Sequence, residues 1–478
     1  MRTICGTFLL VMFASAAPVV EPIRLHPANP HYFLFRGKPT VLVSSGEHYG
    51  AVINRDFDYK RYLKTLAADH LNLTRTFTGA YREGPESFGI KDNTLAPAHD
   101  RFLAPWPRTD VPGALDGLTK FDLTRWNPEY FARLQDFVRE AGAQGIVVEL
   151  TMFCPFYRDE MWNLSPLNAG NNVNGIGNYK REEVFTLKDP AMQKVQDALV
   201  RKIVDELRDF DNVVYEICNE PYSFNLVAAE WERHIAYLIE GAESKRPHLI
   251  TQNISNGSKK IASPNPNVAV FNFHYSRPPL SVALNWNLER PIGCNETGFD
   301  GQADAVYRVQ GWEFVMAGGA LYNNLDYSFT VGHEDGTYSY PAGQPGGGSV
   351  ALRKQLGNLR DFMGALDVVS MIPVKDFVQS GIPPGGSIWV LVAPRKMYAL
   401  YLHHGNPQKD QRVKYAVDGT RHTAELGVDL PKGKYQLEWV DPKTGMVMKQ
   451  DSFAHKGGMY TLESPEYVED IALRMRVR

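Results

Sequence analysis

The stretch "VVYEICNEPYSF", which runs from Val213 to Phe224, decides the fold that we predict for this chain. It opens with β-branched, aromatic and aliphatic residues, the composition of a buried strand. It then ends in Asn219-Glu220-Pro221, an amide and a carboxylate followed by a residue that stops a strand. A buried strand that ends on two polar side chains indicates a sheet whose carboxyl edge carries a functional site.

Similar apolar runs occur on both sides of this stretch, and amphipathic segments separate most of them. Proline follows a capping residue at Asn127-Pro128 and at Asp189-Pro190, which is typical of a helix start. Besides the opening stretch, we predict strands at 41–45, 71–77, 145–153, 248–252, 268–274, 291–296 and 319–325, and helices at 57–68, 127–143, 189–210, 224–243, 281–288, 303–316 and 350–366.

The alternation of strands with helices predicts a parallel sheet, so the fold class is α/β. Eight such units indicate a closed (β/α)8 TIM barrel. An open, doubly wound sheet is the structural alternative. That fold would place a glycine-rich dinucleotide turn after the first strand, and Ser44 to Val52 ("SSGEHYGAV") does not have that pattern.

Beyond about residue 370 the pattern changes to short alternating runs separated by turns, such as "SIWVLVA", "MYALYLHH" and "EDIALRMRV". Asp441-Pro442-Lys443-Thr444-Gly445 lies between two of these runs, where proline presets φ and glycine takes the positive φ of a hairpin turn. We therefore expect the barrel at 39–368 and a C-terminal β-sandwich at 369–478.

The first residues have the pattern of an export signal. Arg2 precedes a short apolar run, and small residues at 14–17 fit a cleavage site. The run is too short to span a bilayer, and no later segment reaches about 18 uninterrupted apolar residues. We expect a signal peptide at 1–17, a secreted or periplasmic mature protein, and a small hairpin or strand segment at 18–38 that closes the barrel floor or packs on the sandwich.

Net charge, cysteine number and ligand spacing indicate which partners and cofactors to expect. The chain has 478 residues and a formal net charge of -3, which gives no indication of a nucleic-acid or membrane partner. Cys154, Cys218 and Cys294 remain after the signal, an odd number that does not suggest a disulfide framework. No cluster has zinc-ligand spacing, so we predict neither a metal nor a cofactor.

Two carboxylates lie at predicted strand ends. Glu220 ends the fourth strand, and Glu296 ends the seventh in "PIGCNETGF". In barrels of this kind the chemistry lies at the carboxyl ends of the strands. Two carboxylates that face each other across the barrel mouth can cleave an acetal, because one protonates the leaving oxygen while the other attacks the sugar carbon. Glu216 has the same strand parity as Glu220, so we expect it inside the barrel as a buried, paired carboxylate, and Glu149 with it.

These motifs resemble those of clan A retaining glycoside hydrolases, the cellulase-like, family 5-like group. "YEICNEP" is similar to the clan's fourth-strand signature, and "PIGCNETGF" to its seventh-strand nucleophile motif. The resemblance implies that Glu220 is the acid/base and Glu296 the nucleophile. The C-terminal runs "ALYLHHG" and "EWVDPKTG" resemble the β-sandwich behind apiosidase-like barrels.

The resemblance also assigns binding roles. Asn219 would hydrogen-bond the sugar 2-hydroxyl. "NFHY" is similar to the sixth-strand motif, which gives His274 or Tyr275 a role in the cleft, with Tyr275 orienting the nucleophile. "LNLTRTF" is similar to the second-strand motif, which makes Arg75 a partner of the nucleophile.

Three more residues are substrate-binding candidates. His48 follows the first strand and would reach the non-reducing sugar; the alternative is a loop histidine bonded to backbone. Trp162 lies in a long Asn/Gly-rich loop, where it would stack on a sugar or pack under the loop. The clan often has a tryptophan after strand eight, and "LYNNLDYSF" places Asn324 and neighbouring polar residues there instead.

We therefore predict a glycoside hydrolase that cleaves O-glycosidic bonds of plant or microbial glycans by double displacement, with an oligosaccharide or polysaccharide as partner. The absence of the strand-eight tryptophan favours a pocket for a terminal or short-oligosaccharide sugar. Two alternatives remain open. One is an endo-acting glucanase or mannanase with an extended groove, and the other is a non-catalytic carbohydrate-binding protein on a barrel scaffold.

Overall fold

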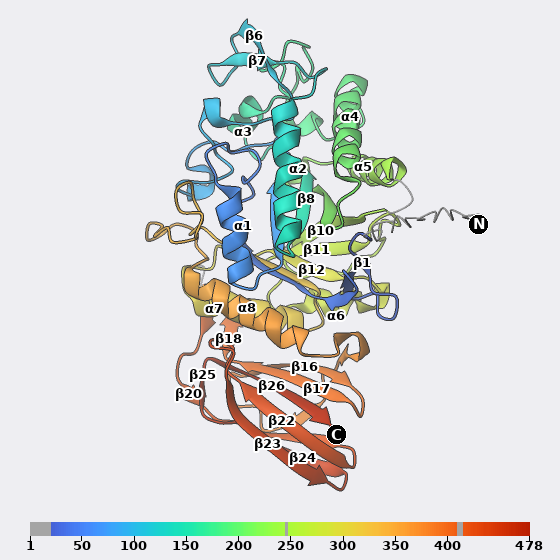
Figure 1. Ribbon diagram of the computed structural model, residues 1–478, viewed down its shortest axis with the longest axis vertical. Coiled ribbons are helices and arrows are strands. Elements are labelled where there is room, and N and C mark those ends of the chain that lie inside the picture. Colours follow the sequence, from blue (N-terminus) through green and yellow to red (C-terminus); the bar gives the residue numbers. More distant parts are fainter. Residues whose placement is uncertain (1–20, 244–246, 409–413) are drawn as a thin grey trace, which may run out of the picture.

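The computed structural model describes residues 21–243, 247–408 and 414–478. The predicted signal peptide at 1–17, and the first residues of the segment predicted at 18–38, lie outside the described residues. Figure 1 shows a helix-covered parallel sheet followed by a layer of antiparallel strands, with α7 and α8 at their junction. Within the described part of the chain, no helix is long and apolar enough to cross a membrane.

Eight parallel strands form the barrel, in the order β4-β13-β12-β11-β10-β9-β8-β5. The two end strands meet through Asn72, whose backbone N–H donates to the Val43 carbonyl at 3.2 Å and whose Oδ1 accepts from the Val43 N–H at 2.8 Å. The predicted fold class is confirmed. The strands are β4 (Leu42–Gly46), β5 (Leu73–Phe77), β8 (Val147–Phe153), β9 (Val213–Cys218), β10 (Leu249–Asn256), β11 (Val270–His274), β12 (Ile292–Glu296) and β13 (Leu321–Leu325).

Helices cover the outside of the barrel, and polar caps set their starts. The Asn127 side chain accepts from the Glu129 N–H at 3.1 Å, and the Asp189 side chain from the Ala191 N–H at 2.9 Å, so both predicted Asx-Pro starts are confirmed. The helices are α1 (Tyr59–Ala68), α2 (Pro128–Ala143), α4 (Pro190–Leu207), α5 (Ala229–Ala242), α6 (Leu280–Asn285), α7 (Asp304–Met316) and α8 (Val350–Gly364).

The predicted start of one helix is wrong. We expected a helix from residue 224, whereas α5 begins at Ala229. Phe224 and Asn225 have φ values of 54° and lie in the left-handed region, which an α-helix cannot include. A short 3-10 turn, Ser223–Asn225, therefore separates the end of β9 from α5.

A small antiparallel sheet lies at the barrel floor, the end opposite to the strand termini that carry Glu220 and Glu296. It comprises β1 (Arg24–Leu25), β2 (Phe33–Phe35) and β3 (Lys38–Thr40). Ile23 N–H donates to the carbonyl of Asp211, two residues before β9 begins. Arg36 makes a two-pronged contact with the Asp211 carboxylate at 2.6 and 2.8 Å.

Long loops cover the carboxyl end of the barrel. The loop after β5 contains a hairpin of β6 (Arg108–Pro112) and β7 (Thr119–Phe121), and the loop after β8 contains the short helix α3 (Asp159–Leu164). Sequence patterns did not predict these elements. They place side chains from two separate loops above the strand ends.

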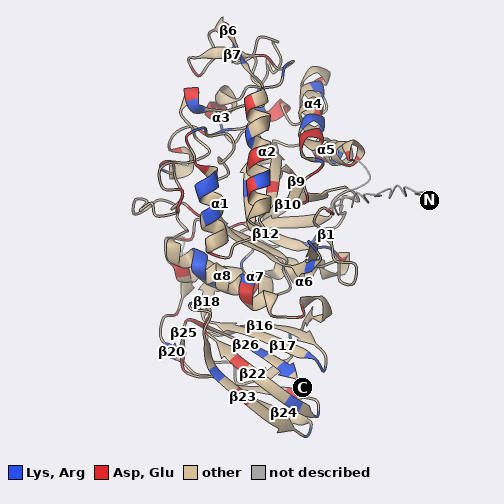
Figure 2. Cartoon of the chain, in the orientation of Figure 1, with Lys and Arg blue, Asp and Glu red and all other residues tan. Residues whose placement is uncertain are grey.

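The C-terminal region packs a six-stranded antiparallel sheet and a three-stranded one around a second apolar core. This confirms the predicted sandwich. In Figure 2, acidic and basic residues are interspersed over both regions of the described chain. The strands are β14 (Ile372–Pro373), β15 (Val378–Ser380), β16 (Ser387–Ala393), β17 (Met397–His403), β21 (Glu425–Leu430), β22 (Gly433–Val440), β23 (Val447–His455), β24 (Gly458–Glu463) and β26 (Asp470–Val477), with shorter pairs β18 (Gly405–Pro407) with β19 (Tyr415–Val417) and β20 (Arg421–His422) with β25 (Tyr467–Val468).

Candidate active site

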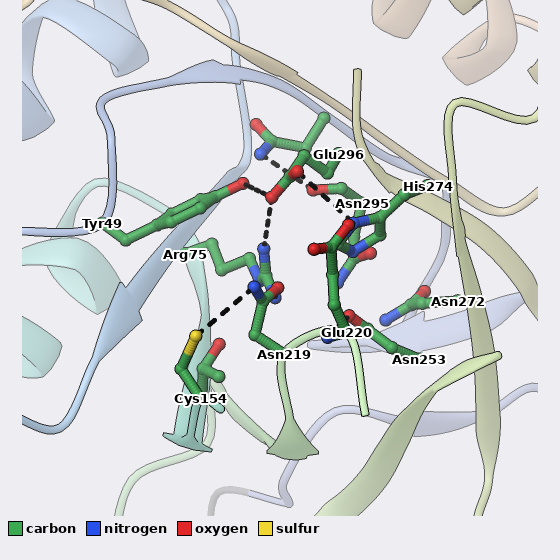
Figure 3. Close-up of polar contacts among 12 residues, drawn as sticks. Tyr49, Arg75, Cys154, Asn219, Glu220, Asn253, Asn272, His274, Asn295 and Glu296 are labelled. Carbon is green, nitrogen blue, oxygen red and sulfur yellow. Dashed lines mark hydrogen bonds and ion pairs between the residues drawn. The ribbon is translucent and has the colours of Figure 1, made fainter. Parts of the chain in front are cut away.

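Glu220 and Glu296 meet at the carboxyl end of the barrel. Glu296 is the last residue of β12, and Glu220 follows β9 by two residues with a φ of 39°. The Glu220 N–H donates to Asn253 Oδ1 at 3.1 Å, which anchors the turn. One carboxyl oxygen of each glutamate and a ring nitrogen of His274 all lie within 4.8 Å of one another (Figure 3). The barrel therefore brings the two carboxylates face to face.

Glu296 is surrounded by donors. Tyr49 Oη donates to Glu296 Oε2 at 2.7 Å, Tyr275 Oη donates to Oε1 at 2.5 Å, and Arg75 Nη1 donates to Oε2 at 3.3 Å. Burial raises the pKa of Glu296, but the charges of His274 and Arg75 and the bond from Tyr275 outweigh burial and hold the pKa well below its usual range. Glu296 is therefore an ionised carboxylate held in a fixed orientation.

His274 lies between the two glutamates, with Nδ1 3.2 Å from Glu220 Oε1 and 3.4 Å from Glu296 Oε1. Burial lowers the pKa of His274, but the two carboxylates more than reverse this and raise it to about 9. The imidazole is then protonated at neutral pH. Glu220, His274 and Glu296 are also residue types that bind divalent cations, but a metal would have to displace the Nδ1 proton that both carboxylates stabilise.

A buried polar network lies beneath the site. Arg75 forms ion pairs with both Glu216 and Glu296, and its Nη2 donates to Asn219 Oδ1 at 2.7 Å. Glu216, predicted from strand parity to point into the barrel, is fully buried, and so is Glu149. Asn295 Nδ2 donates to both of these carboxylates. This network fixes the Arg75 guanidinium and, through it, the Glu296 carboxylate.

Glu220 has a more open environment than Glu296. Its side chain is 15% exposed, against 8% for Glu296. Tyr157 Oη donates to Glu220 Oε2 at 3.0 Å, and Asn219 Nδ2 donates to Tyr157 Oη at 2.8 Å. Asn219 thus positions the tyrosine that holds Glu220, in addition to its contact with Arg75.

A cavity of about 100 Å³ opens onto both glutamates. Its wall combines aromatic rings with three carboxylates, and side chains of the loops after β5 and β8 narrow it. The lining residues are His48, Tyr49, Phe77, Glu83, Phe88, Leu95, Cys154, Tyr157, Asn219, Glu220, Tyr275, Glu296, Phe299 and Leu325.

Backbone strain is concentrated in this wall. Five residues that line the cavity and are not glycine have a positive φ, a conformation that is costly for bulky side chains. Such strain is maintained when the surrounding structure holds the residue for a purpose other than stability. These residues are Tyr49, Phe88, Glu220, Tyr275 and Phe299.

The structure separates the predicted site residues into three groups. His48, Asn219, Tyr275 and the two glutamates line the cavity. Arg75 and His274 are fully buried behind the glutamates; Arg75 contacts Glu296, and His274 contacts both. The other two candidates, Trp162 and Asn324, do not line the cavity.

Trp162 packs beneath its loop, which corrects the prediction that it stacks on a sugar. Its ring is buried against Phe156 at a centroid distance of 4.9 Å, and its Nε1 donates to the Tyr179 carbonyl at 3.0 Å. The ring also stacks on Tyr179 at a centroid distance of 6.5 Å, so the indole is in contact with two aromatic rings and its polar edge is hydrogen-bonded within the protein.

Asn324 belongs to the barrel wall, which corrects its assignment as a substrate-binding residue. Its side chain is fully buried. Asn324 Nδ2 donates to Ser45 Oγ at 3.1 Å, and Oδ1 accepts from Thr297 Oγ1 at 3.3 Å. These bonds join β13 to its neighbours β4 and β12 and leave the amide no free side towards the cavity.

Besides Phe77 at the end of β5, sequence patterns missed five polar or aromatic wall residues, Tyr49, Glu83, Phe88, Tyr157 and Phe299. Each lies in a loop, where no periodicity indicates which side chains face inward. A signal for Tyr49 was present, since it adjoins His48 in "SGEHYG" directly after the first barrel strand.

Comparisons of the sequence with known proteins give one partial match to a family. A family model described as a domain of unknown function (DUF6298) matches residues 92–232, under a third of the chain. No curated protein matches the chain. Its sequence therefore carries no established activity from a relative.

Solved structures with the same fold include glycoside hydrolases at low sequence identity. A Bacteroides vulgatus protein described as a glycoside hydrolase has a TM-score of 0.65 at 15% identity, over 97% of this chain and 84% of that one. A family 5 glycoside hydrolase from the same organism has a TM-score of 0.61 at 12% identity, over 95% of this chain and 93% of that one. An endo-1,4-beta-mannanase from Rhizomucor miehei has a TM-score of 0.50 at 13% identity, over 72% of this chain and 100% of that one. At such identities the likeness shows a shared barrel fold, and the resemblance of the sandwich to apiosidase-like proteins stays a prediction.

Proposed function

We propose that this protein is a retaining glycoside hydrolase with Glu296 as nucleophile and Glu220 as acid/base. A Glu296 oxygen attacks the anomeric carbon while the bond to the leaving oxygen breaks and Glu220 gives that oxygen its proton. Glu220 then removes a proton from water, the water oxygen attacks the same carbon, and the bond to Glu296 breaks. The chain returns to its starting state, with the glycosidic bond hydrolysed.

The short separation of the two carboxyl groups carries this proposal. Their oxygens approach within 4.8 Å. Retaining enzymes hold their carboxyl groups about 5–5.5 Å apart, whereas inverting enzymes need about 6.5–9.5 Å to admit a water between them. The spacing here favours direct attack by Glu296 over activation of an intervening water.

The environments of the two glutamates support the assignment of roles. Glu296 receives bonds from Tyr49, Tyr275 and Arg75 that favour its ionised form. Glu220 is the more exposed of the two, which suits an acid/base that must reach both the leaving group and water. His274 contacts both carboxylates and stabilises the negative charge that passes between them.

Variants of the two glutamates test the proposal. Glu296→Gln should abolish hydrolysis of every substrate in a panel of aryl glycosides. Glu220→Ala should slow substrates with poor leaving groups most, because good leaving groups need no protonation. Glu232→Gln is a matched control, because Glu232 is a buried glutamate on α5 that does not line the cavity.

Two results would contradict the proposal. If Glu296→Gln kept wild-type activity, the nucleophile would lie elsewhere. If the wild-type protein bound glycans but hydrolysed no member of a broad glycoside and polysaccharide panel, a non-catalytic binding protein would be the better interpretation.

We also propose that the protein acts outside the cytoplasm, because the first residues have the pattern of a cleavable export signal. N-terminal sequencing of the protein recovered from the periplasm or medium of an expressing bacterium tests this. A mature N-terminus near residue 18 is expected, and retention of Met1 in a cytoplasmic product would contradict it.

A further inference from the structure

His48 and Glu83 face the cavity on the side of the nucleophile. The His48 ring stacks on Tyr49 at a centroid distance of 5.3 Å, and Tyr49 donates directly to Glu296. If Glu296 attacks the sugar and Glu220 protonates the leaving group, as proposed above, the attacked sugar lies on the Glu296 side. His48 and Glu83 are therefore placed beside the sugar ring that is transferred.

The pair has an unused hydrogen-bonding group. His48 Nε2 lies 3.4 Å from Glu83 Oε2, but His48 Nδ1 is buried and has no hydrogen-bond partner among the described residues. A buried polar atom without a partner is costly, by about 1–3 kcal/mol. A sugar hydroxyl in the cavity would supply the missing partner.

Neighbouring residues hold both side chains in place. Glu83 accepts from Asn93 Nδ2 at 2.5 Å and from Tyr81 Oη at 3.1 Å. The loop that carries His48 is fixed by the Glu47 carboxylate, which accepts from the backbone N–H groups of Gly50 and Ala51 at 2.9 and 3.1 Å. A preorganised pair of this kind can discriminate between hydroxyl patterns, because it does not rearrange to fit.

The charged residues of the cavity wall indicate whether the bound sugar is charged or neutral. Among the described residues, neither lysine nor arginine lines the cavity, and the one lining histidine, His48, is already paired with Glu83, so an anionic sugar finds no unpaired cation there. Glu83 is paired with His48, and Glu296 with Arg75, which leaves no strong net charge for a cationic sugar on this side. Apolar side chains of Phe77, Leu95 and Leu325 complete the wall.

We propose that His48 and Glu83 form a specificity-determining pair that binds hydroxyl groups of one uncharged sugar on the Glu296 side of the cavity. This deepens the proposed function, on which it rests. Because both side chains are almost fully buried, we infer that the cavity ends at this pair and that hydrolysis releases monosaccharide from a chain end. The pair is separate from the two carboxylates that perform the chemistry.

Deoxy substrates test the pair directly. The wild-type protein is assayed on 4-nitrophenyl glycosides of neutral sugars, and then on the 3-, 4- and 6-deoxy analogues of the best one. We expect one analogue to lose about 100-fold in kcat/KM, because it leaves the buried pair without its hydroxyl. For Glu83→Gln, kcat/KM on the parent glycoside should fall by a similar factor. The variant should then hydrolyse the parent glycoside and that deoxy analogue with nearly equal kcat/KM.

His48→Gln provides a second variant if Glu83→Gln does not fold, and Glu86→Gln is the matched control. Glu86 lies in the same loop with an exposed side chain, and pairs with Lys91 instead of facing the cavity. The control should keep wild-type activity and wild-type discrimination between the parent and deoxy glycosides.

The possible results distinguish a failure of the His48–Glu83 pair from a failure of the proposed hydrolase function. A wild-type protein inactive on every glycoside would contradict the proposed function itself. An active protein whose folded Glu83→Gln and His48→Gln variants keep the full wild-type discrimination would overturn only the pair. Equal kcat/KM values on a neutral glycoside and on the matching 4-nitrophenyl glucuronide or glucosaminide would also overturn the proposed pair. A ladder of oligosaccharides as first products would overturn it as well.

Discussion

Glu296 is buried and yet ionised, which defines its chemistry at the scale of the residue. A buried carboxylate normally holds its proton, because the charged form loses its hydration. Here the protein supplies Tyr49, Tyr275, Arg75 and protonated His274 in place of water. These groups keep the carboxylate charged and aimed at the cavity, which a nucleophile requires.

Removing one of these donors should slow the reaction. Tyr275→Phe keeps the ring and deletes the bond to Glu296. A hydrogen bond to a charged group contributes about 1.5–3 kcal/mol, so kcat/KM should fall by about 10–100-fold. Tyr215→Phe is the control, because Tyr215 is a buried tyrosine of β9 whose hydroxyl has no partner in the described structure. Equal kcat/KM for Tyr275→Phe and the wild type would show that the bond contributes nothing to the reaction.

The raised pKa of Glu149 predicts how the stability of the fold depends on pH. Burial and the nearby Glu216 raise the pKa of Glu149 to about 7, whereas an unfolded glutamate titrates near 4.3. Between these values the folded protein holds a proton that the unfolded chain has released, so stability falls as pH rises through this window. Above about pH 7 both states have lost the proton and this contribution is constant.

Glu149→Gln should remove that pH dependence. The glutamine is neutral at every pH, and the Asn295 Oδ1 atom, which has no partner in the described structure, can accept a bond from its amide. In thermal melts, the Tm of the variant should rise relative to the wild type between about pH 4.5 and 7. A difference in Tm that is constant across this range would show that Glu149 is ionised throughout.

Motifs at strand ends allowed the two glutamates, Asn219 and Tyr275 to be predicted as site residues, because a strand end in a barrel has a defined position. Glu83 and Tyr157 could not be predicted. They lie in long loops whose side-chain directions depend on contacts such as that of Tyr157 with Glu220, 63 positions away. Trp162 was assigned to the substrate for its residue type, although burial decides its role.

At the scale of the element, too, features set by local sequence were predicted, and features set by distant contacts were not. The starts of the two helices that open with an Asx-Pro pair were predicted within one residue, since the cap is a local interaction, as between Asn127 and the Glu129 N–H. The start of α5 was not, because left-handed conformations at Phe224 and Asn225 depend on the turn that presents Glu220. The hairpin of β6 and β7 and the short helix α3 have no strong periodicity of their own.

The loop after β8 provides a prediction at this scale. Trp162→Phe keeps an aromatic ring against Phe156 and deletes the bond to the Tyr179 carbonyl. The free energy of unfolding should fall by about 1 kcal/mol, the usual contribution of a hydrogen bond, plus any loss of packing. Because the indole does not line the cavity, kcat/KM should stay at the wild-type value. A folded variant with a large loss of kcat/KM would restore Trp162 as a sugar contact.

At the scale of the whole molecule, the barrel and the sandwich share a buried interface. Trp312 of α7 stacks on Tyr401 of β17 at 5.3 Å. Arg308 of α7 binds both oxygens of Asp470 at 2.9 Å, and Tyr401 Oη donates to the same carboxylate at 2.8 Å. The change of pattern near residue 370 predicted two regions, but Arg308 and Asp470 are too far apart in sequence for any local pattern to pair them.

Breaking this pair should destabilise the protein. Asp470→Asn removes one of the two carboxylates that pair with the buried Arg308, while Glu469 stays in contact with Nη2 at 2.6 Å. The loss should therefore be at most about 3–5 kcal/mol, the cost of removing one partner of a buried pair. Denaturant unfolding followed by tryptophan fluorescence measures the loss. Asp451→Asn, on the exposed face of β23, is the control and should be neutral. Equal stability of the two variants would mean that the interface does not depend on the ion pair.

The central claim is that Glu296 forms a covalent bond with the sugar, and trapping that intermediate tests it most directly. A 2-deoxy-2-fluoro glycosyl fluoride of the preferred sugar slows both steps, while its good leaving group still allows the first. After incubation, mass spectrometry of the proteolysed protein should show one glycosyl adduct, on the peptide that contains Glu296, and none in Glu296→Gln. An adduct on another residue, or no adduct together with first-formed product of inverted anomeric configuration, would contradict the claim.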